Sequence, residues 1–79
     1  MLRKKEARIV ITFCTTTAAM QTEALARELK LSGRLIPVPR EITAGCGLAW
    51  SAPPESGNDL PRLLIQKGIA VQDIYKLVI

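Results

Sequence analysis

The sequence predicts an α+β domain in which one four-stranded antiparallel sheet carries two helices on one face. The first observation behind this class is the order of the elements, because strand-like and helix-like segments follow one another as βαββαβ. The second is Pro37, which lies inside the second strand-like segment and fits only an edge strand. The third is the length of 79 residues, at which one domain over residues 1–79 is expected.

A first strand is expected over residues 7–14, where β-branched residues dominate and apolar residues recur with period two. Its buried face is expected to hold Ile9, Ile11 and Phe13. The less buried face then holds the alternating residues Val10, Thr12 and Cys14. The basic residues before this strand, 1–6, are expected to form a frayed, solvated N-terminus.

A helix is expected over residues 18–31, which are rich in good helix formers. The threonines at 15–17 supply its N-cap, and Gly33 is its stop signal. The helical spacing predicts a buried face of Ala18, Thr22, Leu25 and Leu29. The other side of the helix carries Glu23, Arg27 and Lys30, and Glu23 is spaced to pair with Arg27.

Two short strands are expected in the middle of the chain. The first covers residues 34–38, and Pro37 within it and Pro39 after it assign it to a sheet edge. Residues 39–45 form a loop, and the next strand covers residues 46–52. In that strand Leu48 and Trp50 share one face, and Trp50 is expected to belong to the core.

The last part of the chain predicts a second helix and a final strand. Asn58 or Asp59 caps the helix, Pro61 fits its first turn, and Gly68 ends it after about Lys67. The final strand covers residues 71–79. With right-handed crossovers the strand order becomes 4-1-3-2, which is the ferredoxin-like arrangement and puts the proline-containing strand at an edge.

Composition excludes several kinds of chemistry. The chain has no His, which removes an imidazole base and His metal ligands. Its two Cys are too few for a thiolate zinc site, an iron–sulfur cluster or a disulfide scaffold. We therefore expect no metal site and no cofactor, and a reducing cytoplasm as the compartment.

Neither a membrane nor a nucleic acid is an expected partner. The apolar run at residues 9–11 stops at Thr12, which is too short for a signal peptide or a membrane span. The net charge of +4 is held mostly by residues 1–8. The aromatic residues form no stacking platform because they lie in three separate segments, at Phe13, Trp50 and Tyr75.

The predicted topology brings both cysteines to one end of the sheet. Cys14 ends the first strand and Cys46 begins its antiparallel neighbour, and the first helix starts beside them. The free N–H groups and the positive dipole end of a helix favour a thiolate, which is the nucleophilic form. Arg40 adds a positive charge nearby, and Gly45 and Gly47 leave Cys46 open to a partner.

Simpler interpretations of these residues stay open. Each cysteine is also compatible with an inert, small apolar residue, and the two glycines with ordinary turn residues. Arg40 is also compatible with solvated surface.

One stretch of sequence resembles a known family. Residues 37–49 read PVPREITAGCGLA, and they are similar to the signature of small selenium/sulfur carrier-like proteins. The helix start at Phe13–Glu23 and the terminal Ile74–Lys76 also resemble that family, so the resemblance covers about Arg8–Lys76. It implies that Cys46 holds sulfur or selenium as a persulfide-type adduct. Cys14 stands where the family has a serine or similar small residue, so a role for Cys14 depends on the topology alone.

Three functions follow from these observations. The first is a cytoplasmic carrier, not an enzyme, which takes sulfur or selenium onto Cys46 from a cysteine desulfurase-like protein and passes it to a protein acceptor. Cys14 would act as the resolving thiol, and Arg40 would stabilise the thiolate. The second is a non-catalytic interaction or regulatory module of the same fold. The third is a Cu(I) chaperone using both cysteines. The exposed edge strand also allows a homodimer.

Overall fold

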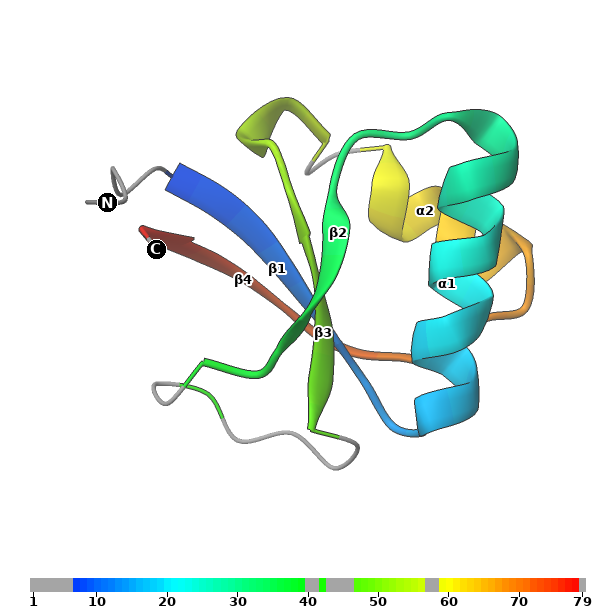
Figure 1. The fold of residues 1–79 in the computed structure, drawn as a ribbon, viewed down its shortest axis with the longest axis horizontal. Helices are drawn as coiled ribbons and strands as arrows, with labels where there is room; N and C mark the ends of the chain where they lie inside the picture. Colours follow the sequence, from blue (N-terminus) through cyan, green and yellow to red (C-terminus); the bar gives the residue numbers. More distant parts are fainter. Residues whose placement is uncertain (1–6, 40–41, 43–46, 57–58, 79) are drawn as a thin grey trace.

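The computed structural model describes residues 7–39, 42, 47–56 and 59–78. The expected N-terminal extension at 1–6 and the site residues Arg40, Gly45 and Cys46 lie outside the described residues. The elements follow in the order β1 (Ala7–Phe13), α1 (Thr16–Leu29), β2 (Arg34–Pro37), β3 (Leu48–Ala52), the short 3₁₀ turn η1 (Pro54–Ser56), α2 (Leu60–Gln66) and β4 (Val71–Val78) (Figure 1).

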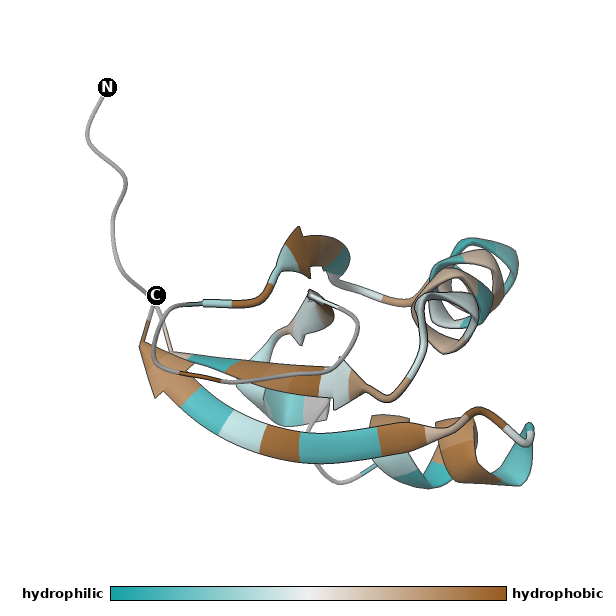
Figure 2. Cartoon of the chain, turned by 90° about the horizontal axis from the view of Figure 1, so that it is seen from below, coloured by the Kyte–Doolittle hydropathy of each residue, from teal (hydrophilic) through white to brown (hydrophobic). Residues whose placement is uncertain are grey.

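The four strands form one antiparallel sheet in the order β2-β3-β1-β4. This is the predicted order, counted from the other edge, and the α+β ferredoxin-like arrangement is confirmed. Pro37 lies on the edge strand β2, as its missing N–H requires. The opposite edge is β4, which mixes hydrophilic and hydrophobic residues along its length (Figure 2).

Both helices lie on the same side of the sheet (Figure 1). Between them and the sheet is the main core, which includes the predicted buried face of β1. The core residues are Ile9, Ile11, Phe13, Ala18, Ala19, Ala26, Trp50, Ala52, Leu60, Leu64 and Ile69. The expectation that Trp50 belongs to the core is therefore confirmed.

The buried face of α1 differs from the predicted one at a single large residue. Ala18 and Thr22 are buried and Leu25 packs against the core, but Leu29 is 46% exposed. Ala19 and Ala26 pack against the core in its place. The buried stripe of α1 is centred on Thr22, which leaves Leu29 at the edge of that stripe.

The end of α1 explains this shift. Lys30 adopts the left-handed conformation at φ 56° and ψ 42°, and the N–H of Leu31 donates to the carbonyl of Ala26 at 2.8 Å. These features form the Schellman turn that commonly ends a helix. The helix therefore ends two residues earlier than predicted, and Leu31 instead of Leu29 turns back against the core.

The helix ends agree with the predicted caps in part. Thr15 Oγ1 accepts a hydrogen bond from the N–H of Ala18 at 3.1 Å, which confirms the predicted N-cap of α1. Asp59 precedes α2, but its side chain makes no capping hydrogen bond. Gly68 ends α2 with φ +75°, as predicted.

The second face of the sheet is also covered, which the sequence interpretation did not anticipate. Val10 and Thr12 are fully buried, so the prediction of a less buried face is wrong for both. Ile42, from the connection between β2 and β3, packs with Val10 and Ala49 on this face. Four half-buried residues extend this second cluster, namely Ile36, Val38, Tyr75 and Leu77.

The polar side chains buried in the sheet find partners. Thr12 Oγ1 accepts from the N–H of Asp73 at 3.1 Å, beside the point where the β1–β4 register shifts. Ser51 Oγ accepts from Arg8 Nε at 3.0 Å. These bonds offset the desolvation of the two hydroxyl groups, so both residues fit a sheet that is covered on both sides.

Gly33 lies directly against Trp50 and β3. A Cβ atom at this position would stand 2.6 Å from both Trp50 Nε1 and the carbonyl oxygen of Ser51, and its φ is +126°. Gly33 is therefore required for a close approach as well as for its backbone conformation.

Gly33→Ala should lower the free energy of unfolding by about 3 kcal/mol, because backbone strain and overpacking add. The matched control is Gly68→Ala, where φ is +75° but a Cβ meets open space, so about 1 kcal/mol is expected. Chemical denaturation of the two variants measures the difference. Equal losses in the two variants would show that Gly33 is needed for its φ alone.

Ile42→Ala should lower the free energy of unfolding by about 2 kcal/mol, because Ile42 is only 7% exposed against the second face of the sheet. Ile65→Ala on α2 is the control, since Ile65 is 66% exposed and its loss should cost about 0.5 kcal/mol or less. Urea denaturation compares the two. A loss for Ile42→Ala no larger than the control would mean that this connection does not stabilise the sheet.

Candidate functional site

Cys14 lies where β1 leads into α1. It directly follows the last residue of β1 and is exposed, with a free thiol. Thr15 is the N-cap, so Cys14 directly precedes the N-cap residue of α1. The first N–H groups of a helix lack acceptors within the helix, and its dipole is positive at this end.

The connection between β2 and β3 is closed by a backbone hydrogen bond. The N–H of Val38 donates to the carbonyl of Gly47 at 3.0 Å, next to the last ladder pair of Pro37 and Leu48. Gly47 is exposed, has φ +76°, and a side chain there would meet open space. Within the connection, the N–H of Ile42 donates to the carbonyl of Pro39 at 3.0 Å.

The sheet register relates these two regions. Thr12 pairs with Ala49 in the β1–β3 ladder, and Cys14 lies two residues after Thr12 while Gly47 lies two residues before Ala49. The described chain thus brings Cys14 and Gly47 to the same end of the sheet as the start of α1. Of the other residues that the sequence pointed to, Pro37 and Pro39 lie in β2 and just after it, and Arg40, Gly45 and Cys46 lie outside the described residues.

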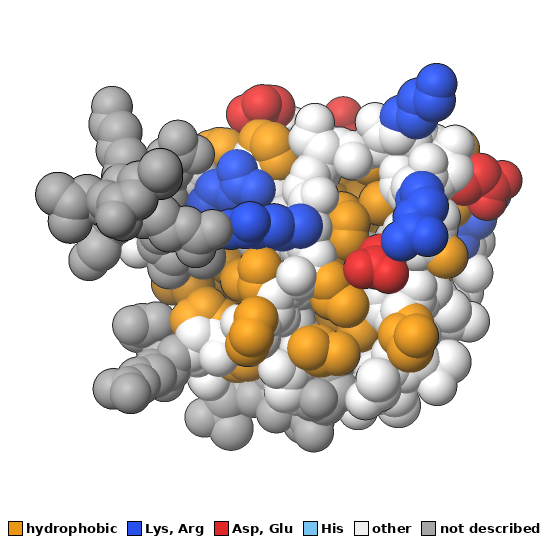
Figure 3. Space-filling model, in the orientation of Figure 1, with side chains coloured by type: hydrophobic (Ala, Val, Ile, Leu, Met, Phe, Trp, Pro, Cys, Tyr) orange, Lys and Arg blue, Asp and Glu red, His pale blue; other side chains and the backbone are white. Residues whose placement is uncertain are grey.

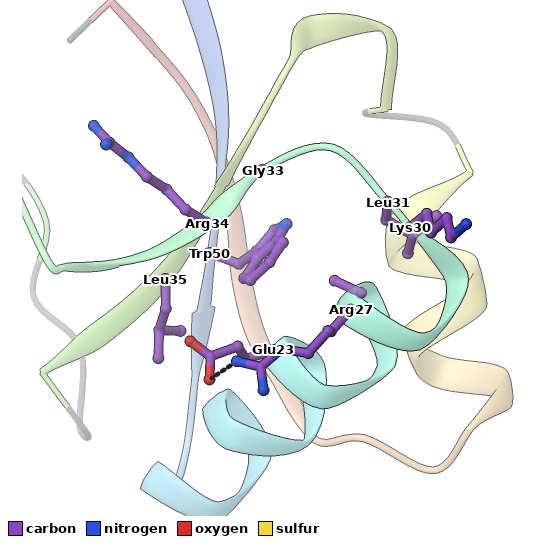
Figure 4. A pocket seen from close by; sticks show the side chains of 9 residues that line it. Glu23, Arg27, Lys30, Leu31, Gly33, Arg34, Leu35 and Trp50 are labelled. Atoms are coloured by element: carbon purple, nitrogen blue, oxygen red, sulfur yellow. Dashed lines mark ion pairs between the residues drawn. The ribbon is translucent and has the colours of Figure 1, made fainter.

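A second feature lies between α1 and β2, and the sequence interpretation missed it. A pocket of about 390 Å³ opens there, with the side chain of Trp50 in its floor (Figure 4). The charged residues of its lining are Glu23, Arg27, Lys30 and Arg34. Figure 3 shows basic side chains on both sides of a hollow in this face, with an acidic side chain beside one of them.

Trp50, which lines this pocket with its ring, has an unusual buried polar atom. The residue is 3% exposed, and within the described part of the chain its Nε1 has no hydrogen-bond partner. Leaving such a donor buried and unpaired costs about 1–3 kcal/mol. In Figure 4 the nitrogen is turned toward Gly33 and the connection from α1.

One sequence signal was available for this pocket. Arg27, Lys30 and Arg34 follow one another at short spacing around the helix end, and Trp50 is the single tryptophan of the chain. The left-handed turn at Lys30 ends α1 before the chain enters β2, and nothing in the sequence marks a lysine for that conformation.

The described residues show neither a candidate metal site nor a candidate membrane helix. They include no group of three or more Cys, Asp or Glu side chains placed to hold a metal ion. No helix within them has the length and apolar character needed to cross a bilayer.

Comparison with known proteins gives one match. No curated protein and no solved structure matches the chain. A family model described as "Putative Se/S carrier protein-like" matches residues 8–76. This match covers β1 through most of β4 and includes the whole connection between β2 and β3. The chain therefore belongs to the Se/S carrier protein-like family.

Proposed function

We propose that this protein is a cytoplasmic carrier that holds sulfur or selenium on Cys46 as a persulfide-type adduct and delivers it to another protein. The observation that carries the proposal is the family match over residues 8–76, which includes the Gly-Cys-Gly segment at 45–47. A carrier needs an accessible thiolate and a surface that fits its partners, and it needs no enclosed substrate pocket.

Open access on one side of the cysteine supports the proposal. Gly47, its neighbour in the chain, is exposed, and no atom other than those of its immediate neighbours lies within 4 Å of where a side chain would begin. The hydrogen bond from Val38 to Gly47 holds this point of the chain to the end of β2. This open and anchored point, next to Cys46 in the chain, lies at an end of the sheet, which favours the approach of a partner protein.

The electrostatics of the same end also support it. α1 begins two residues after Cys14, and Thr15 already satisfies one of its free N–H groups by accepting from Ala18. The remaining N–H groups favour negative charge at this end of the sheet. Arg40 is proposed to add its guanidinium to the stabilisation of the Cys46 thiolate.

Loading of the carrier is a thiol–persulfide exchange. The Cys46 thiolate attacks the terminal sulfur of a persulfide on a donor protein of the cysteine desulfurase type. A bond forms between Cys46 Sγ and that sulfur, and the bond from the sulfur to the donor cysteine breaks. The donor leaves as a thiolate, so no external oxidant or reductant is consumed. The same exchange moves selenium when the donor carries it.

Cys14 is proposed to release the cargo. Its thiolate attacks Cys46 Sγ, the terminal sulfur or selenium leaves as hydrosulfide or hydroselenide, and a Cys14–Cys46 disulfide forms. A dithiol reductant then restores both thiols. The exposure of Cys14 and its place at the same sheet end as Gly47 support this step, which requires the two Cα atoms to come within about 4.4–6.8 Å.

Incubation with a cysteine desulfurase and cysteine should add the mass of one sulfur atom to the protein. Mass spectrometry of peptides should locate it on Cys46, and a dithiol should remove it. Cys46→Ser should abolish the adduct, whereas Cys14→Ser should keep it. A folded wild-type protein without the adduct, or with it on Cys14 alone, would contradict the carrier assignment. If Cys46→Ser instead retained every function of the protein, the non-catalytic module would be the better description.

Cys14→Ser should slow the release of hydrosulfide from the loaded protein by about tenfold or more, because a thiol within the same molecule acts at a high effective concentration. The variant should also lack the Cys14–Cys46 disulfide that we expect non-reducing peptide mapping to find in the wild type after release. Cys14 is exposed, so the substitution should leave the thermal unfolding midpoint unchanged. Unaltered release kinetics would remove Cys14 from the mechanism.

A further inference from the structure

The two edges of the sheet differ in how well they are closed to a further strand. β2 is four residues long and contains Pro37, whose missing N–H interrupts the row of hydrogen-bonding groups. β4 is eight residues long and contains no proline, and within the described part of the chain it pairs with β1 alone (Figure 2). Long edges without such protection pair readily with another strand. β4 is therefore the edge at which the sheet can be extended.

The backbone groups of β4 alternate between β1 and the open side. Asp73 turns its N–H to β1, where it donates to Thr12 Oγ1 at 3.1 Å. From Asp73 to Val78 the pairing with β1 is regular, so the alternate residues turn their N–H and C=O groups the other way. Ile74 and Lys76 therefore present these groups to the open edge.

The same edge carries an exposed apolar side chain and a mostly apolar pocket. Ile74 is 47% exposed and lies opposite Ile11 in the ladder, so it stands on the face of the sheet that bears the helices. A pocket of about 190 Å³ lies between β1, β4 and η1, and its lining includes Ile9, Pro54 and Lys76. Lys76 lies opposite Ile9, so it shares the face of Ile74.

A second copy of this chain fits the edge in one register. Two antiparallel strands related by a twofold axis pair about one central residue, and centres near the strand ends pair few residues. A centre at Ile74 would run into the register shift before Asp73. A centre at Lys76 would place two lysines directly opposite each other, which is unfavourable. A centre at Tyr75 avoids both, and it pairs Ile74 of each copy with Lys76 of the other.

This register brings the apolar side chain to the pocket. Ile74 of one copy stands opposite Lys76 of the other, and therefore beside the pocket that Lys76 lines. The twofold axis makes this contact twice. At the axis the two Tyr75 side chains lie directly opposite each other on the second face of the sheet, where aromatic pairs are favourable.

We propose that this protein forms a symmetric homodimer through β4, in which residues 73–77 of two copies pair antiparallel about Tyr75 and their two sheets become one. The partner is a second copy because the exposed side chain and the pocket beside which it comes to lie belong to the same edge. The interface includes neither Gly47 nor the start of α1, so it does not depend on the carrier function.

Disulfide trapping tests the register. Tyr75 is the central pair and lacks ladder hydrogen bonds, so its two Cα atoms stand about 4.5 Å apart, which a disulfide can span. In a protein with Cys14→Ser and Cys46→Ser, the further change Tyr75→Cys should give a covalent dimer with oxidised glutathione. Lys76→Cys in the same background is the matched control. Its two copies stand about 7–8 Å apart on the diagonal and should cross-link poorly.

Ile74→Lys tests the contact without a new cysteine. Sedimentation equilibrium of the wild type should show reversible dimers between micromolar and millimolar concentration. Ile74→Lys places lysines opposite each other and removes the apolar contact, so it should raise the dissociation constant by about tenfold or more. Met20→Lys is the matched control, because Met20 is 60% exposed on α1 and the charge change is the same. Cys46→Ser should dimerise like the wild type, which separates this test from that of the carrier.

Three results would overturn the proposal. One is a wild-type protein that stays monomeric at millimolar concentration. Another is an equal effect of Ile74→Lys and Met20→Lys on the dissociation constant, which would mean that the dimer does not use β4. The third is equal cross-linking of Tyr75→Cys and Lys76→Cys, which would contradict pairing about Tyr75.

Discussion

Both faces of β1 are buried, and the other elements are arranged around that burial. From Ile9 to Phe13 no residue is more than 2% exposed. α1 and α2 cover one side, and Ile42 from the β2–β3 connection helps to cover the other. A domain of this size buries only about 60% of the surface of its unfolded chain, so a second covered face is a large part of its stability. The segment that leads to Cys46 is therefore tied to the core through Ile42.

Much of the fold could be predicted because local signals and topology agreed. The alternation in β1, the cap at Thr15 and the stop at Gly68 are local, and Pro37 independently marked the edge strand. The prediction of burial was wrong at positions that are covered by a segment far away in the sequence. Periodicity shows that Val10 and Thr12 share a face, but only the connection that carries Ile42 buries them. The prediction that Leu29 is buried was wrong for a local reason, because the left-handed turn at Lys30 ends the helix and Leu31 packs against the core instead.

The cysteine region and the pocket differ in how far they could be predicted from the sequence. Antiparallel pairing alone predicted that the end of β1 and the start of β3 share a sheet end, and Cys14 and Gly47 do lie there. The pocket between α1 and β2 depends instead on two backbone features, the turn at Lys30 and the close approach of Gly33 to Trp50. Neither of these backbone features can be predicted from the conformational preferences of single residues. The prediction that Trp50 belongs to the core was correct, but it did not anticipate that the buried indole N–H has no hydrogen-bond partner in the described part of the chain.

The proposal of a carrier thiolate at Cys46 rests on membership in the Se/S carrier-like family, on the open position at Gly47 and on the start of α1 at the same end of the sheet as Gly47. The most direct test is the pH dependence of alkylation in the Cys14→Ser variant, in which Cys46 is the only thiol. The account predicts that the pKa of Cys46 lies below the ordinary value for a cysteine thiol, and that it rises toward that value in a further Arg40→Gln exchange. A Cys46 pKa at or above the ordinary value would contradict it.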